Sequence, residues 1–120
     1  MVMDSTVRDT FDRLASEYDD LKLRIIPGYR KIQEMALRYS TGAIRVLELG
    51  CGTGEWAARF LEENPDAEYH AIEFSAKMRE LAAARLSAHG DRFRLIDQDL
   101  NAPLPAGPFD LVVSFLSLIH

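Results

Sequence analysis

The segment VLELGCGTG, residues 46–54, constrains the fold of this chain more than any other stretch. An apolar run that carries Glu48 is followed by three glycines, Gly50, Gly52 and Gly54, at alternate positions. Glycine adopts positive φ angles readily and lets another molecule approach the main chain, at an entropic cost to folding. The pattern therefore predicts a strand that turns tightly into a helix, with a ligand close to the backbone of the turn.

Apolar periodicity predicts alternating helices and strands along the chain. We expect helices at 5–20, 29–39, 54–63 and 75–88, and strands at 43–49, 67–73, 92–97 and 109–115. In the helix at 29–39, one face carries Ile32, Met35, Ala36 and Tyr39. Short apolar strands that alternate with helices indicate parallel pairing through right-handed crossovers. The fold class is therefore α/β, with a doubly wound parallel sheet.

Composition limits the classes of function. A length of 120 residues predicts a single domain. The formal net charge of −5, from 14 basic and 19 acidic residues, does not support nucleic acid as a partner. The longest apolar run, at 111–119, is too short to span a membrane, and the N-terminus lacks the apolar segment of a secretory signal. One cysteine excludes an intrachain disulfide, so we expect a cytoplasmic protein.

Acidic residues flank the glycines and restrict the ligand. A dinucleotide-binding loop follows the pattern G-x-G-x-x-G and holds a pyrophosphate at the helix N-terminus. Here Glu55 takes the place of the third glycine of that pattern. Glu48 and Glu55 would repel a pyrophosphate and would favour a ligand that carries positive charge. A nicotinamide-dependent oxidoreductase is therefore the less favoured alternative.

The same motif resembles the first motif of the class I S-adenosylmethionine-dependent methyltransferases, an acid-x-G-x-G-x-G pattern at the end of the first strand. Glu48, Gly50, Gly52 and Gly54 match it without a substitution. The resemblance implies S-adenosylmethionine as the cofactor and S-adenosylhomocysteine as the product, with the methionine part of the cofactor against the loop. This cofactor carries a sulfonium and an ammonium but no phosphate, which suits acidic surroundings.

Later segments extend the resemblance in the expected order. Glu73, at the end of the second predicted strand, corresponds to the acid that binds the ribose hydroxyls. In DQDL, Asp99 resembles the aspartate that reaches the adenine amino group, and Leu100 supplies a backbone N–H. FDLVVSFLSLIH resembles the fourth-strand motif, with Ser114 and Phe115 near the methyl group that is transferred. The implied cofactor-binding residues are Glu48, Gly50, Cys51, Gly52, Thr53, Gly54, Glu73, Phe74, Asp99, Leu100, Ser114 and Phe115. We assign no catalytic residue and no metal ligand from the sequence.

The resemblance covers about residues 44–120 and implies a Rossmann-like core at 43–120 behind an N-terminal helical lid at 1–42, within a single domain. It implies the strand order 3-2-1-4, without the C-terminal strands of the seven-stranded fold. The chain is therefore expected to be a fragment or an engineered half. Its fourth strand would be an open apolar edge, and we expect homodimerisation through residues 110–119.

The implied activity is methyl transfer to an acceptor, which the acidic chain and the helical lid predict to be a small molecule. The alternative is a cofactor-binding half without turnover. Tyr18 and Tyr29 are expected to pack in the core or in the lid, and Trp56 to pack against the lid. Asp110, which precedes the fourth strand, is expected to cap a turn.

Overall fold

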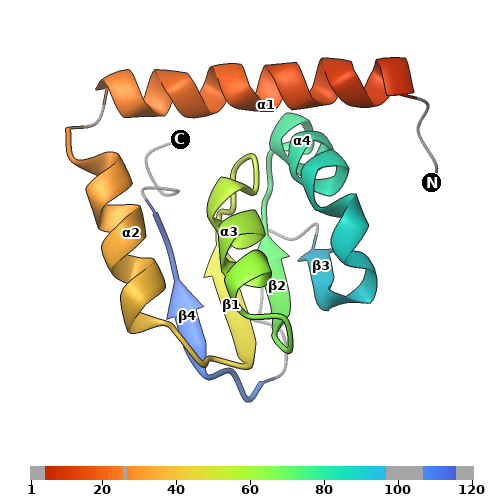
Figure 1. Ribbon diagram of the computed structural model, residues 1–120. Coiled ribbons are helices and arrows are strands. Elements are labelled where there is room, and N and C mark those ends of the chain that lie inside the picture. The colour runs from red at the N-terminus through yellow and green to blue at the C-terminus, as the bar shows by residue number, and fades with distance from the viewer. Residues whose placement is uncertain (1–4, 26, 97–106, 116–120) are drawn as a thin grey trace.

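The structure is a computed structural model that describes residues 5–25, 27–96 and 107–115 (Figure 1). In chain order, its elements are α1 (Ser5–Ile25), α2 (Tyr29–Tyr39), β1 (Arg45–Leu49), α3 (Glu55–Glu63), β2 (Glu68–Ile72), α4 (Ala76–Leu86), a 3-10 segment (Ser87–Arg92), β3 (Phe93–Ile96) and β4 (Leu111–Val113). The predicted alternation of helices and strands is confirmed. The predictions for Asp99 and Leu100 lie outside the described residues.

The four strands form one parallel sheet in the order β3-β2-β1-β4, which confirms the predicted topology. In the interior strand β1, Val46 is paired with Tyr69 of β2 on one side and with Leu111 of β4 on the other. Because the strands are parallel, their carboxyl ends share one edge of the sheet. Figure 1 shows α1 running across this edge, over the ends of the strands.

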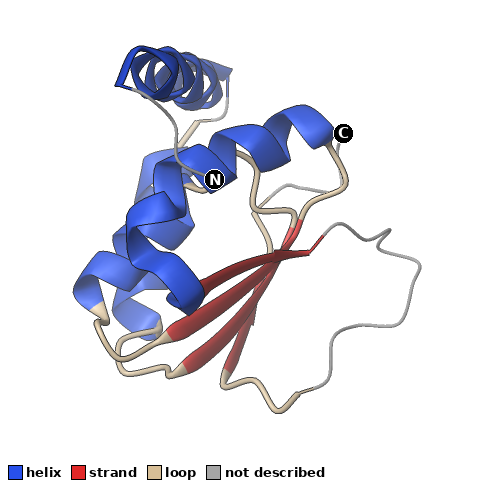
Figure 2. Cartoon of the chain, turned by 90° about the vertical axis from the view of Figure 1, so that its right-hand side faces the viewer, coloured by secondary structure: helices blue, strands red, loops and turns tan. Residues whose placement is uncertain are grey.

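The described helices lie on one side of the sheet, as Figure 2 shows. Their apolar faces and the facing side of the sheet form the core, with Trp56, Phe60 and Tyr69 in contact at its centre. The ring centroids of Trp56 and Phe60 are 5.4 Å apart, and those of Phe60 and Tyr69 are 5.7 Å apart. Aromatic side chains bury large apolar areas, so this cluster fixes α3 against β2. Among the described helices, none combines the length and the hydrophobicity that a membrane span requires.

The first helix is longer than its apolar pattern predicts. The pattern indicates an end at residue 20, but α1 continues to Ile25. No glycine or proline interrupts the chain before Pro27. Proline disfavours the helical conformation of the residue that precedes it, so the helix ends just ahead of Pro27.

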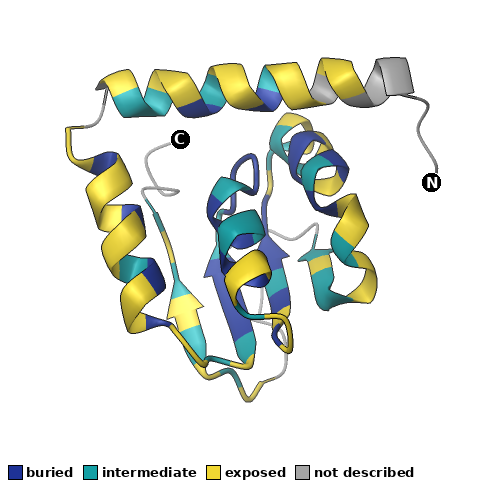
Figure 3. Ribbon diagram, viewed as in Figure 1, coloured by how far each residue is buried: buried dark blue, intermediate teal, exposed yellow. Residues whose placement is uncertain are grey.

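The apolar face predicted for α2 is not the packed face (Figure 3). Its exposed side chains are Ile32 (51%), Met35 (44%) and Tyr39 (87%). The buried stripe of α2 contains Tyr29, Gln33 and Leu37 instead. The indole N–H of Trp56 donates a hydrogen bond of 3.1 Å to the backbone carbonyl of Gln33, which turns this stripe towards α3.

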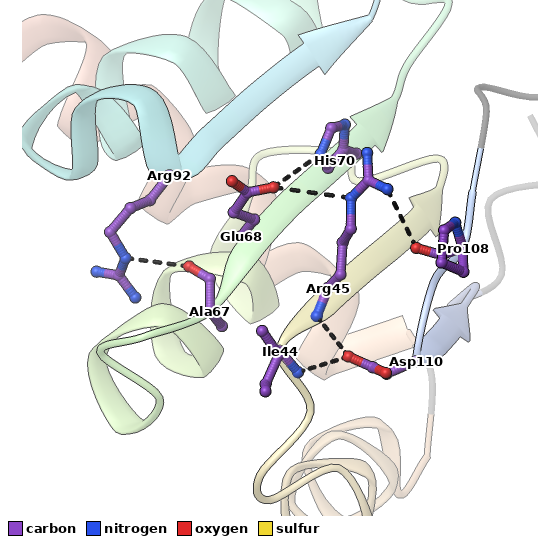
Figure 4. A network of polar contacts seen from close by, with 8 residues as sticks. All are labelled: Ile44, Arg45, Ala67, Glu68, His70, Arg92, Pro108 and Asp110. Atoms are coloured by element: carbon purple, nitrogen blue, oxygen red, sulfur yellow. Dashed lines mark hydrogen bonds and ion pairs between the residues drawn. The ribbon is translucent and has the colours of Figure 1, made fainter.

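The start of β1 is held to β4 by Asp110 (Figure 4). One carboxylate oxygen of Asp110 accepts hydrogen bonds from the backbone N–H groups of Ile44 (2.9 Å) and Arg45 (2.8 Å). Its own N–H donates to the carbonyl of Arg45 at 2.8 Å. Asp110 is therefore a cap, as predicted, although it caps the start of a neighbouring strand. β4 is shorter than the predicted 109–115, because Asp110 contacts the start of β1 through its side chain and regular pairing begins only after it.

Replacing Asp110 tests this role. Asp110→Ala removes the acceptor shared by two backbone N–H groups and should lower the free energy of unfolding by about 1 to 2 kcal/mol. Asp110→Asn keeps an acceptor oxygen, so its free energy of unfolding should fall by a smaller amount. Urea unfolding followed by circular dichroism measures both variants. An equal loss in the two variants would contradict the assigned role.

Candidate functional site

The glycine loop, residues 50–54, joins β1 to α3 at the carboxyl edge of the sheet. Gly50, Gly52 and Gly54 have φ angles of 79°, 57° and 80°. Residues with a side chain rarely adopt these angles, which explains the choice of glycine. The N–H of Gly50 donates a hydrogen bond of 2.7 Å to the carbonyl of Ile72 in β2. The loop therefore forms the predicted tight turn between strand and helix.

Two of the glycines face different neighbours. A Cβ atom on Gly54 would lie 2.7 Å from a methyl group of Leu86 and 3.3 Å from Cβ of Ala82, both on α4. A Cβ atom on Gly52 would instead lie 3.0 Å from the ammonium nitrogen of Lys22 on α1. Gly54 is thus required for close packing of α3 on α4. Gly52 borders the space between the loop and α1, where a ligand could approach the backbone.

Glu48 is the acid of β1 and is only 2% exposed. Its carboxylate accepts a hydrogen bond of 2.5 Å from the hydroxyl of Tyr69. Burial raises the pKa of Glu48 to about 7; the Tyr69 hydrogen bond and the charge of Lys22 oppose the shift, and the charge of Glu73 adds to it. A positive group brought close to Glu48 would favour its ionised form.

Glu73 follows β2 and connects it to the glycine loop. Its carboxylate is 1% exposed and accepts two backbone hydrogen bonds, from Gly52 at 2.9 Å and from Ser75 at 3.0 Å. Each carboxylate oxygen still has a second lone pair for a further donor. The neighbouring Phe74 is 49% exposed. Glu73 therefore sets the shape of the loop and retains capacity to accept hydrogen bonds from a ligand.

A small cavity of about 10 Å³ lies between the glycine loop and the N-terminal helices, with room for about one water molecule. Five of the residues predicted to bind the cofactor line it: Glu48, Gly50, Cys51, Thr53 and Phe115. The structure thus brings together residues from the ends of β1 and β4 and from the loop.

The cavity is acidic. Three acidic side chains, Asp19, Glu48 and Glu55, line it against one basic side chain, Lys22. Burial together with the charge of Asp19 raises the pKa of Glu55. Burial and these three carboxylates raise the pKa of the Tyr29 hydroxyl to about 12, so this hydroxyl stays protonated. The side-chain carbonyl of Gln33 is buried and has no hydrogen-bond partner among the described residues. Such surroundings favour a ligand that is cationic or donates hydrogen bonds, and disfavour a phosphate.

Cys51 does not supply a nucleophile. Burial raises the pKa of its thiol well above the usual value, and the charges of Glu48 and Glu73 raise it further. The thiol therefore stays protonated, and Cys51 is a small, buried residue of the loop. Within the described part of the chain, His, Cys, Asp and Glu side chains form no group of three that could hold a metal ion.

The end of β4 closes one side of the cavity. The hydroxyl of Ser114 donates a hydrogen bond of 3.0 Å to the carbonyl of Leu49 in β1. The ring centroid of Phe115 lies 5.2 Å from that of Trp56, and both side chains line the cavity. Trp56 packs against the N-terminal helices, as predicted, through its hydrogen bond to Gln33 of α2.

A polar cluster that the sequence did not predict joins α1 to the loop and to α4. The Thr53 hydroxyl donates to one oxygen of Asp19 at 2.6 Å, and Arg85 donates to the other at 2.6 Å. Arg85 also donates to the hydroxyl oxygen of Thr53 at 3.1 Å. The available signal was the position of Asp19, one helical turn after Ala15 on the packed face of α1. Nothing in the local sequence pointed to Arg85 as its partner.

Comparisons with known proteins agree with this geometry. Residues 46–120 match the family model described as a methyltransferase domain. An uncharacterised methyltransferase from Anoxybacillus flavithermus is 35% identical over 120 residues, which cover 93% of this chain and 53% of the relative. Demethylmenaquinone methyltransferase from Thermus thermophilus is 33% identical over 105 residues, which cover 87% of this chain and 44% of the relative. The chain thus spans about half the length of these curated relatives.

A solved structure shows the same fold. The crystal structure of a putative S-adenosylmethionine-dependent methyltransferase from Methanococcus maripaludis superposes with a TM-score of 0.66 at 25% identity, over 88% of this chain and 50% of that protein. The family match spans the glycine loop and the sheet, and the strand order is the one that the family implies. This chain therefore belongs to the class I S-adenosylmethionine-dependent methyltransferases.

Proposed function

We propose that this chain forms the cofactor-binding part of an enzyme that transfers a methyl group from S-adenosylmethionine to a small-molecule acceptor. The observation that carries the proposal is a buried acid, Glu48, beside a glycine loop whose Gly52 borders an acidic cavity. Membership of the family supports the type of reaction. The quinone-type acceptor in the name of the Thermus thermophilus relative supports the class of acceptor.

The residues of the site fit this cofactor. Gly52 faces α1, and its neighbour there is the flexible side chain of Lys22, so the methionine part of the cofactor would lie on this side of the loop. Glu48 would offset its positive charge, and the free carbonyl of Gln33 would accept a hydrogen bond from an ammonium group. The bound cofactor supplies an electrophilic methyl group on a sulfonium, which is already a good leaving group.

The remaining predicted residues receive these roles in the proposal. The unused lone pairs of Glu73 would accept hydrogen bonds from the ribose hydroxyls. Asp99, Leu100 and Phe74 would surround the adenine. Cys51 and Thr53 would line the loop, and Ser114 and Phe115 would lie near the methyl group. Gly50 and Gly54 would serve through the shape of the loop.

This chain would act by orientation and by exclusion of water. A sulfonium leaving group asks little acid–base chemistry of the protein, so alignment of donor and acceptor contributes most. The walls formed by Trp56, Phe115 and Tyr29 would keep water from the reacting atoms. We also place the chain in a reducing compartment, the cytoplasm, because its one cysteine is a free thiol.

Binding without turnover is the second candidate. This chain corresponds to 44% and 53% of the two curated relatives, so cofactor binding and turnover are tested separately for it. Incubation with S-adenosylmethionine labelled in the methyl group and a panel of quinol and carboxylate acceptors separates the two candidates. Label in an acceptor supports the enzyme. Saturable cofactor binding with no labelled product supports the binding module.

We further propose that two copies associate through the edge of β4. Val112 on this strand is 56% exposed, and within the described residues β4 pairs only with β1. Light scattering at tens of micromolar protein should show a dimer, and Val112→Lys should shift it towards the monomer, because a charge on the edge disfavours pairing. A monomeric unmodified chain would contradict this proposal.

Gly52→Ala tests the position of the cofactor. The added methyl group would project into the space next to Lys22 and should weaken binding of S-adenosylhomocysteine by about tenfold or more. Gly42→Ala is the control, since Gly42 also has a positive φ, +89°, but no heavy atom within 4 Å of the added Cβ. The affinity of this control variant for S-adenosylhomocysteine should be unchanged. Calorimetric titration measures both, with NADH as the control ligand. Equal losses in the two variants would argue against a cofactor at Gly52, and a folded chain that binds neither ligand would overturn the proposed function.

The raised pKa of Glu48 predicts a pH dependence of stability. As the pH rises from 4.5 to about 7, the unfolded chain releases this proton before the folded chain does, so the folded state loses stability across that window. The side chain introduced in Glu48→Gln cannot ionise. Relative to the unmodified chain, the free energy of unfolding of this variant should therefore rise by up to about 3 kcal/mol between pH 4 and pH 8. Thermal unfolding over this range measures the difference. Glu62→Gln, an exposed control on α3, should show no such trend.

A further inference from the structure

We propose that α1 is a self-occupying lid, that is, a helix that covers the cofactor site and fills it with its own Lys22 ammonium in place of the cofactor's positive charge. Hydrogen bonds between Asp19, Thr53 and Arg85, here called the clamp, hold the lid closed. The inference rests on the proposed cofactor site and adds a device that controls access to it. It concerns a contact between α1 and the glycine loop, and no step of methyl transfer.

The clamp consists of three side chains from three separate elements. Asp19 of α1 receives one hydrogen bond from Thr53 of the glycine loop and one from Arg85 of α4, each 2.6 Å long. Arg85 and Asp19 keep only 19% and 10% of their side-chain surfaces exposed. Charge-assisted hydrogen bonds with little access to water are the stronger kind. These contacts hold α1 directly over the loop.

The rest of the described part of α1 is only partly buried. Among the side chains of α1 that the structure describes, only Ala15 and Asp19 are buried (Figure 3). Along this part of the helix, the polar clamp is therefore the main buried contact with the loop and α4. At its C-terminal end, Pro27 and Gly28 lead into α2, and nothing lies within 4 Å of a Cβ built on Gly28.

Lys22 lies one helical turn after Asp19, on the same face of α1. Its ammonium nitrogen is 3.0 Å from the position of a Cβ on Gly52 and 5.8 Å from the centroid of the Tyr29 ring. Its charge stabilises the ionised form of Glu48. A cation thus stands against the backbone of the glycine loop, next to the buried acid, where the methionine part of the cofactor would lie.

The space under α1 excludes the cofactor in this arrangement. The cavity measures about 10 Å³. A site for a ligand of drug size needs about 300 Å³ or more. The ligand can reach Gly52 only if α1 and Lys22 move away. One positive charge then replaces another beside Glu48, so the exchange leaves the charge balance of the acid unchanged.

The first arm of the test needs no ligand. Trp56 is the single tryptophan of the chain and lines the cavity, so its fluorescence reports on access to the site. Asp19→Asn weakens the clamp and should raise the acrylamide quenching constant of Trp56 by about twofold through lid opening. Glu17→Gln, an exposed control on the same helix, should leave it unchanged. Circular dichroism confirms that both variants are folded. Unchanged quenching in folded Asp19→Asn would overturn the clamp.

The second arm measures the affinity for S-adenosylhomocysteine by calorimetry. Lys22→Met removes the competing charge and should tighten binding by about tenfold, because a larger fraction of the chain is then ready to bind. Lys31→Met, an exposed lysine on α2, is the matched control and should bind as the unmodified chain does. Weaker or unchanged binding in Lys22→Met would overturn the inference, since Lys22 would then assist the ligand or not contact its site.

The two arms separate this inference from the proposed function. If no variant binds the ligand although Asp19→Asn increases quenching, the clamp stands, whereas the cofactor site and the exchange of charge at Lys22 are both rejected. If the unmodified chain binds and Lys22→Met does not bind more tightly, the cofactor site stands and the self-occupying lid is rejected.

Discussion

The burial of a carboxylate in the middle of the sheet is the constraint on which this site depends. Strands buried in a parallel sheet normally carry apolar side chains, and a buried ionised group is costly without partners. Glu48 meets this cost through the Tyr69 hydroxyl and the nearby charge of Lys22. Tyr69 also stands in the aromatic cluster with Trp56 and Phe60, so one side chain supports both the acid and the core.

The glycine loop depends on the same edge of the sheet, and its glycines are not interchangeable. Gly54 lets α3 pack on α4, whereas Gly52 keeps the backbone open towards α1. Glu73 links the N–H of Gly52 to the end of β2, so the second acid fixes the shape of the loop. The two carboxylates therefore have different roles: Glu48, on β1, provides negative charge beside the cavity, and Glu73, which follows β2, holds the shape of the loop. This division agrees with a cationic ligand that lies along the backbone.

Charge also links the site to the helix above it. Asp19 is paired with Arg85, and Lys22 faces the side of the cavity that holds Glu48, so the docked helix leaves few charges without compensation. In the proposed lid, the same balance lets a cationic ligand replace Lys22 without leaving Glu48 unpaired. Among the described side chains of α1 only Ala15 and Asp19 are buried, and elements with few buried contacts open at low cost.

By itself, the sequence determined the α/β class, the four strands, the bounds of α2 and the glycine turn, because periodicity and glycine placement are properties of short segments. The resemblance of its motifs determined the family and the strand order. Only the tertiary structure decided which face of α2 packs, that Gly54 serves helix packing, and that Asp19 meets Arg85, which lies 66 residues away. It also placed Lys22 against Gly52. Such contacts join distant residues whose pairing depends on how helices settle on the sheet, and no local pattern encodes that choice.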